Sequence, residues 1–210
     1  QRQMCIRDRL IPHEPHQFGS RRVRKEFAVP YSKLNLAWRL PCSGHPDTPA
    51  LSALASILGG GRSARFYEKF HDRLGLVYSI EVHSNQSETD EGAFTISIDV
   101  DRAQRDKVRD LVLQELRNLA QEDFTEDLKR VCKQTRVSRL RRRSSAAGVA
   151  SEMGADWFGA RNLNLSSEWQ EAIERVTTED LHRVCSTWLS SPNVTEVSLD
   201  PVGSNAAEED

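Results

Sequence analysis

Long apolar runs, paired cysteines and a strong excess of one charge are all missing from this 210-residue chain. No stretch approaches the roughly 18 consecutive apolar residues of a membrane-spanning helix, and the first residues lack the charged-then-apolar pattern of a signal peptide. A formal net charge of −2 argues against a nucleic-acid-binding protein. The four cysteines contain no Cys-x-x-Cys pair, which argues against a zinc ribbon and a dense disulfide framework.

The composition that remains is typical of one globular domain with a polar surface. Hydrophobic residues make up 38% of the chain and charged residues 29%. The opening segment QRQMCIRDRL has no clean period and no turn signals, so we set residues 1–17 aside as an artefactual or disordered leader. We expect a single domain over 18–201 and an acidic tail over 202–210. The compartment stays open between bacterial cytoplasm and periplasm.

Hydrophobic periodicity predicts strands and helices in the first half of the chain. Residues 21–41 alternate between apolar and polar, which predicts extended chain. From Asp47 or Thr48 the period becomes helical, and the glycines of 59–61 end that helix. A second helix is expected at about 62–74, with Gly75 as its left-handed cap. Two strands, 76–85 and 92–101, are expected to form an antiparallel hairpin.

The second half is expected to be mostly helical. Helical periodicity runs over 103–121, Thr125 opens the next helix, and a shorter helical stretch extends through Trp157. In TTEDLHRVCSTWLSSP, Thr177 and Asp180 approximate a capping box, and a closing strand follows in NVTEVSLDP. This order predicts an α+β fold, with a mainly antiparallel sheet packed against several helices.

The triple glycine in ILGGGRSARF (57–66) suggests a phosphate-binding loop, a hinge between two helices, or part of a peptide-binding site. A P-loop needs Lys-Ser/Thr after its glycines, and a dinucleotide-binding loop needs a strand before Gly-x-Gly-x-x-Gly. This run has neither feature. The conformational freedom of glycine therefore favours a tight hinge between helices.

Several segments together resemble the second domain of an insulinase (pitrilysin) family zinc peptidase. They are ALASILGGGRSARFYEKFHDRLGLVYSI, EGAFTISIDVD, LVLQELRNLAQEDFTEDLKRVCKQ and IERVTTEDLHRVCSTWL. The resemblance covers about residues 20–201. It implies a metal-free, C-terminal-type α+β domain that pairs with other domains around an unfolded peptide. Zinc, held in that family by His-x-x-Glu-His, is expected in the partner domain and not in this chain, which lacks the motif.

The resemblance also implies which residues meet the substrate. The metal-free domain of the family supplies an Arg and a Tyr, seven residues apart, that reach the scissile carbonyl. Tyr78 matches the Tyr, but His71 stands where the Arg is expected, and Arg73 is rotated away on a helix. We therefore identify Tyr78 and His71 as candidate catalytic residues. The candidate substrate-binding residues are Gly59, Gly60, Gly61, Arg62 and Ser63.

Two functions stay open on these grounds. In the first, the chain binds extended peptide and completes a zinc metalloendopeptidase together with a zinc-bearing domain, carried by the same full-length chain or by a separate subunit. In the second, it is a non-catalytic scaffold or substrate-binding subunit of the same family. The expected partners are that domain and a peptide, with no nucleic acid and no membrane.

Residues 129–143 form a basic stretch, with eight Lys or Arg residues and no acidic residue. A solvated helix face is one interpretation, and a basic wall that attracts acidic or phosphorylated peptides is another. A nucleic-acid patch is a third, although interleaved aromatic residues are missing.

Overall fold

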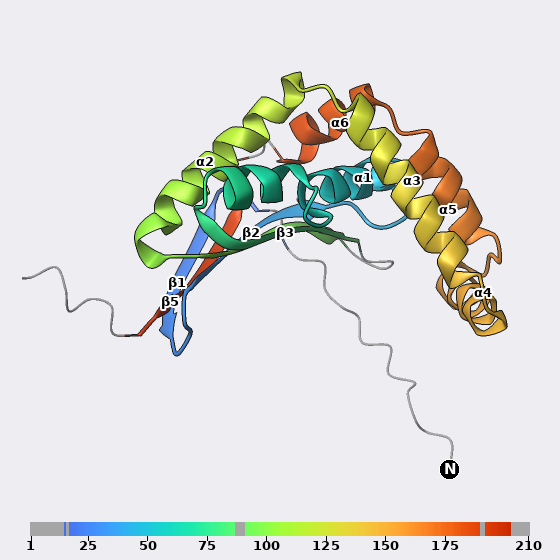
Figure 1. Ribbon diagram of the computed structural model, residues 1–210, viewed down its shortest axis with the longest axis horizontal. Coiled ribbons are helices and arrows are strands. Elements are labelled where there is room, and N and C mark those ends of the chain that lie inside the picture. Colours follow the sequence, from blue (N-terminus) through green and yellow to red (C-terminus); the bar gives the residue numbers. More distant parts are fainter. Residues whose placement is uncertain (1–14, 16, 87–90, 190–191, 203–210) are drawn as a thin grey trace, which may run out of the picture.

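A computed structural model describes residues 15, 17–86, 91–189 and 192–202. In this structure the helices cover one face of a five-stranded sheet, and the other face is open (Figure 1). The chain therefore forms two layers, as the α+β expectation requires.

The sheet has the strand order β1-β5-β2-β4-β3. Neighbouring strands run antiparallel except for β1 and β5, which are parallel. The sheet is therefore mainly antiparallel, with one parallel pair that joins the two ends of the domain sequence. The strands are β1 (Arg21–Phe27), β2 (Ser32–Leu40), β3 (Val77–Asn85), β4 (Gly92–Val100) and β5 (Thr195–Pro201).

The helical layer contains α-helices together with shorter 3₁₀ and π segments. α3, α4 and α5 extend away from the sheet as an arm at one end of the molecule (Figure 1). The segments are α1 (Thr48–Gly59), η1 (Tyr67–Arg73), η2 (Arg102–Gln104), α2 (Arg105–Asn118), η3 (Leu119–Gln121), α3 (Thr125–Arg142), α4 (Ala146–Ala160), α5 (Leu165–Glu174), α6 (Thr178–Val184) and η4 (Cys185–Leu189).

The hydrophobic core lies between the helices and the covered face of the sheet. In β2 every second residue is buried, and β4 alternates in the same way from Phe94 onwards. The apolar side chains of these two strands belong to the same buried cluster as α1, in which eight of twelve residues are buried. Alternation sends the intervening polar side chains to the open face. That face therefore presents polar groups to its surroundings.

Most of the expected elements are present, and some differ in detail. The capping box of Thr177 and Asp180 is complete, with hydrogen bonds in both directions. The segment at 62–74 contains a π-helix, because the Leu74 N–H reaches back five residues to the Lys69 carbonyl (3.0 Å). α5 has no counterpart among the sequence-based expectations. Residues 1–14 and 203–210, from the expected leader and tail, lie outside the described residues.

Asp47 starts α1 but does not cap it with its side chain. The carboxylate instead accepts hydrogen bonds from Arg183 and from the Trp188 indole, the latter at 2.9 Å. Burial by itself would raise the pKa of Asp47, but these two hydrogen bonds, together with the nearby positive charge, outweigh it and hold the pKa below its usual range. Asp47 therefore ties the start of α1 to the end of the domain sequence.

Candidate functional site

The glycine run brings the end of α1 against the edge strand β3. A Cβ atom on Gly59 would lie 2.3 Å from the backbone nitrogen of Val82, so no other residue fits there without movement. The Gly60 N–H donates to the Ser56 carbonyl (2.9 Å) and closes the helix. Gly61 then turns the chain with a φ of +104°, in the region that favours glycine. The run therefore forms the expected tight connection between two helical segments, and it also packs against a strand.

Two hollows lie along β3 on either side of this contact. One, of about 270 Å³, is lined by Gly59, Gly61, Arg62, Tyr67, Ser79, Ile80, Glu81 and His83. The other, of about 300 Å³, lies between α1 and the far end of the strand, and its lining includes Gly60, Val82 and His83. Among the described residues, β3 pairs only with β4. Its outer edge and the two hollows together form what we name the β3 edge site, a place with unpaired backbone groups.

The five predicted substrate-binding residues divide between the site and its support. Gly59, Gly60, Gly61 and Arg62 line the hollows. Ser63 instead accepts hydrogen bonds from Arg130 of α3, at its carbonyl and at its hydroxyl oxygen (2.9 Å). Ser63 therefore links the segment after the glycine run to α3, and it does not line either hollow.

Tyr78 occupies a bulge at the start of β3. Val77 pairs with Val100 and Ser79 with Asp99, which leaves Tyr78 without a partner on β4. Its side chain is 53% exposed, and its hydroxyl donates to Asp101 at 2.8 Å. That hydrogen bond to a carboxylate raises the pKa of Tyr78, so the phenol holds its proton. The bulge therefore presents a neutral hydrogen-bond donor to the surroundings.

His71 lies on η1, and among the described residues no hydrogen bond joins its side chain to Tyr78. Its ring stacks on Tyr67 with the centroids 4.4 Å apart, and its Nδ1 lies 2.7 Å from the Asp72 carboxylate. Tyr67 lines the smaller hollow, and His71 packs against Tyr67 without being one of the lining residues. Arg73 points to Glu68 at 2.5 Å and does not take the place of the missing Arg.

Sequence reasoning missed several residues of the β3 edge site. Glu81 and His83 project from alternate positions of β3, and both line the smaller hollow. The period-two pattern of the predicted strand was the signal that places them on the same face. Tyr67 and Asp101 gave no such signal, because their roles depend on the stacking with His71 and the bulge at Tyr78.

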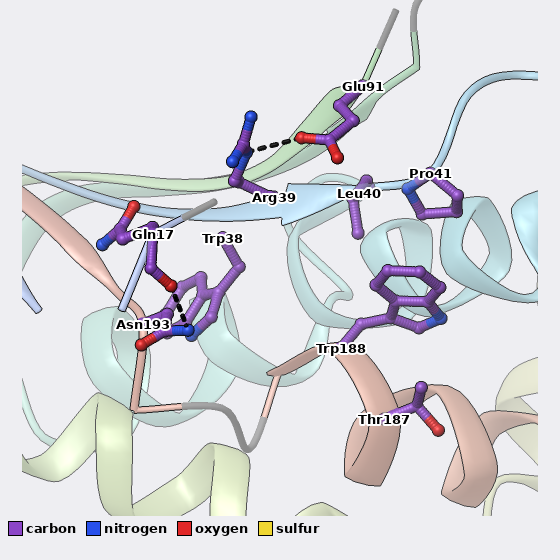
Figure 2. Close-up of a pocket in the computed structure, with 9 residues that line it drawn as sticks. All are labelled: Gln17, Trp38, Arg39, Leu40, Pro41, Glu91, Thr187, Trp188 and Asn193. Atoms are coloured by element: carbon purple, nitrogen blue, oxygen red, sulfur yellow. Dashed lines mark hydrogen bonds and ion pairs between the residues drawn. The ribbon is translucent and has the colours of Figure 1, made fainter. Parts of the chain in front are cut away.

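A further pocket, of about 340 Å³, lies between the end of β2 and η4 (Figure 2). Trp38 and Trp188 line it, and an ion pair between Arg39 and Glu91 (2.6 Å) crosses its rim. Asn193 donates to the Gln17 carbonyl at 2.7 Å. This pocket is aromatic, its charges are matched, and none of the predicted site residues reaches it.

Within the described ranges, His, Cys, Asp and Glu side chains form no group of three or more that is arranged to hold a metal ion. No helix in the described part of the chain is both long and apolar enough to cross a membrane.

Comparison with known proteins places this arrangement in a family. Residues 7–134 match the family model for the peptidase M16 inactive domain. A protein of Rickettsia felis, described as an uncharacterized zinc protease, is 24% identical over 138 residues, which are 66% of this chain and 33% of that protein. The chain thus spans about a third of the length of this curated relative.

Solved structures show the same fold. A protease from Helicobacter pylori superposes with a TM-score of 0.79 and 24% identity, over 90% of this chain and 46% of that one. A peptidase M16 inactive domain from Pseudomonas fluorescens superposes with a TM-score of 0.77 and 20% identity, over 90% of this chain and 45% of that one. The chain belongs to the insulinase, or M16, peptidase family, as its inactive, C-terminal-type domain.

Proposed function

We propose that this domain binds an extended peptide at the β3 edge site and completes a zinc endopeptidase whose metal is held by another domain. The outer edge of β3, free of strand pairing among the described residues and flanked by two hollows, is the observation that carries the proposal. An unfolded peptide can add to such an edge as a further strand. Main-chain hydrogen bonds then supply affinity for many sequences.

The hollows supply side-chain selection. Peptide side chains alternate along an added strand, so every second one would reach the hollows beside the glycine loop. Arg62, Glu81 and His83 give the smaller hollow both signs of charge. A polar lining of this kind suits varied peptides better than a single apolar anchor.

Tyr78 is the proposed contact with the scissile carbonyl. Its hydroxyl would exchange Asp101 for the carbonyl oxygen and donate a hydrogen bond as negative charge develops there. His71 would assist as a second donor through Nε2, since Asp72 lies against its other ring nitrogen, and Nε2 would exchange its 3.4 Å contact with the Tyr67 hydroxyl for the substrate. A histidine is weaker in this role than a guanidinium, because its charge depends on protonation.

A non-catalytic, substrate-holding subunit is the second candidate. The hydrogen bond from Tyr78 to Asp101 favours it, because a donor held by a carboxylate must be released before it can stabilise an oxyanion. The His71 substitution favours it as well. In this case the β3 edge site would bind peptide, but Tyr78 would contribute nothing to turnover.

Complementation separates the two candidates. The chain is combined with a zinc-bearing family domain, and cleavage of oxidised insulin B chain, an unfolded peptide, is followed with and without Tyr78→Phe. A catalytic Tyr78 predicts a kcat about 100-fold lower in the variant, with KM changed by less than about twofold. Equal activity of the two forms would remove Tyr78 from the mechanism. Peptide binding without rate enhancement by the unmodified chain would support the substrate-holding subunit.

A further inference from the structure

A separate pocket of about 380 Å³ lies on the arm, between α3 and α5. It is lined by Arg136, Arg139, Leu140, Arg143 and Gln170. Arg139 follows Arg130 by nine residues, so the two side chains leave α3 about half a turn apart. Because Arg130 contacts the glycine loop, the pocket opens on a different side of α3 from the β3 edge site.

Three guanidinium groups at this pocket face two carboxylates. Arg136 donates twice to one oxygen of Glu174, at 2.8 and 3.1 Å. Arg139 and Arg143 both donate to one oxygen of Glu152, at 3.0 and 2.6 Å. One positive charge remains uncompensated, and each guanidinium keeps N–H groups that these carboxylates do not use.

The carboxylates are ionised at neutral pH. Hydrogen bonds from Gln170 and Arg136 hold the pKa of Glu174 below its usual range. Hydrogen bonds from Arg139 and Arg143 do the same for Glu152, against a smaller opposing effect of burial. The three ion pairs therefore hold the arginines in place, which prepares the remaining N–H groups for a ligand.

Three buried polar atoms of this cluster have no hydrogen-bond partner among the described residues: the Nε atom of Arg139, the Oε1 atom of Gln170 and the Oε2 atom of Glu152. Arg139 and Gln170 line the pocket itself, and Glu152 lies beside it, bound to Arg139 and Arg143. Gln170 is 8% exposed, and its amide nitrogen donates to Glu174 at 2.9 Å. Of the two unpartnered atoms on lining residues, one is a donor and the other is an acceptor, and a buried polar group without a partner is costly. A ligand that both accepts and donates would satisfy these two.

From these contacts we infer that the pocket binds a phosphate group. A tetrahedral phosphate accepts hydrogen bonds from several directions at once, which suits three converging arginines. Unlike sulfate, inorganic phosphate keeps at least one O–H at pH 7 and can donate it to Gln170, and a phosphate monoester, whose second pKa is about 6, keeps one in part of its population. Leu140 is 65% exposed at the same pocket and offers an apolar contact for whatever carries the phosphate.

The test uses the 210-residue chain and titration with inorganic phosphate at pH 7 and constant ionic strength, read by calorimetry. The double variant Arg136→Gln/Arg143→Gln removes two pocket charges, at side chains that are 64% and 41% exposed, so the fold is retained. We expect phosphate affinity to fall by about tenfold or more. The matched control, Arg141→Gln/Arg142→Gln, removes two exposed charges of the same helix that do not line the pocket, and should change affinity by less than about twofold.

Gln170→Leu tests the donor requirement. We expect the unmodified chain to bind phosphate more tightly than sulfate, and this variant to lose the preference. A phosphoserine peptide, compared with its unphosphorylated form and with inorganic phosphate, distinguishes a phosphorylated polypeptide from the free anion as the source of the group. Equal weakening by both double variants would mean that phosphate is attracted only by the overall charge of the helix. No saturable phosphate binding would mean that the pocket is not a phosphate site. Either result would overturn the inference. The β3 edge site plays no part in these measurements.

Discussion

The two edges of the sheet are built in opposite ways. At one edge, five of the seven residues of β1 are charged, and side chains from this strand form ion pairs, as in Arg22 with Glu196 and Arg24 with Asp106. At the other edge, β3 carries few charges and contacts the glycine loop so closely that a methyl group would not fit. Charged side chains on an edge strand discourage the addition of another strand. Of the two edges, the β3 edge is therefore the one we propose for an added peptide.

The ends of the sheet also differ in what holds them to the helices. Beneath β5, Asp200 accepts hydrogen bonds from Arg105 of α2 and from Ser32 of β2, the latter at 2.6 Å. Beneath β3, α1 packs closely against the strand. Phe66 and Phe70, at the segment that precedes β3, are buried there. One end is thus fixed by buried charge and the other by close packing. Substitutions at each end should separate stability from peptide binding.

Asp200→Asn should have the largest effect on stability. It removes the buried carboxylate partner of Arg105 and leaves only the half-exposed Asp106, which lowers the free energy of unfolding by up to about 3–5 kcal/mol at pH 7. Peptide affinity at the far edge should stay within about twofold under native conditions. Urea unfolding and calorimetry with oxidised insulin B chain check the two halves of this expectation, and a loss of affinity in a folded variant would contradict the separation.

The stability difference between this variant and the unmodified chain should depend on pH. Burial opposes ionisation of Asp200, but hydrogen bonds from Ser32 and Arg105 hold its pKa below the usual value. A depressed pKa gives stability that is complete above the unfolded-state pKa of about 3.9 and is lost as the pH falls through the folded-state pKa. The difference should therefore be constant at neutral pH and shrink below about pH 4.

Gly59→Ala should have a smaller effect on stability and a larger effect on binding. The new Cβ would push α1 away from Val82 and cost about 1–3 kcal/mol of unfolding free energy. Because the hollows beside the edge change shape, peptide affinity should fall by about tenfold. Gly44→Ala is the matched control, since a Cβ at Gly44 meets nothing within 4 Å. Similar peptide affinities for both variants would show that the contact of Gly59 with Val82 does not contribute to peptide binding.

Sequence periodicity was enough for elements that bury one face. The alternation of β2, the hairpin of β3 and β4, and the capping box at Thr177 are all present as expected. α5 was missed because its turn signals are weak and few of its residues are buried. The parallel pairing of β1 with β5 depends on contacts between segments more than 150 residues apart, such as Arg22 with Glu196, which no local pattern encodes.

The candidate site was less predictable than the fold. The glycines and Tyr78 are visible in the sequence, but a β-bulge is a one-residue mismatch between two strands and leaves no periodic signal. The same holds for the arm pocket, where residues of α3 meet Gln170 of α5. The basic stretch at 129–143 indicated charge, and only the packing of the helices shows which arginines converge.

Hydrogen exchange along the two edge strands tests the central claim most directly. The chain is labelled with and without oxidised insulin B chain, and exchange is followed by mass spectrometry over β1 and β3. Strand addition predicts that peptide slows exchange in β3 by about tenfold or more and leaves β1 unchanged. Unchanged exchange in β3 at saturating peptide, or equal protection of both edges, would contradict the β3 edge site as the place where peptide binds.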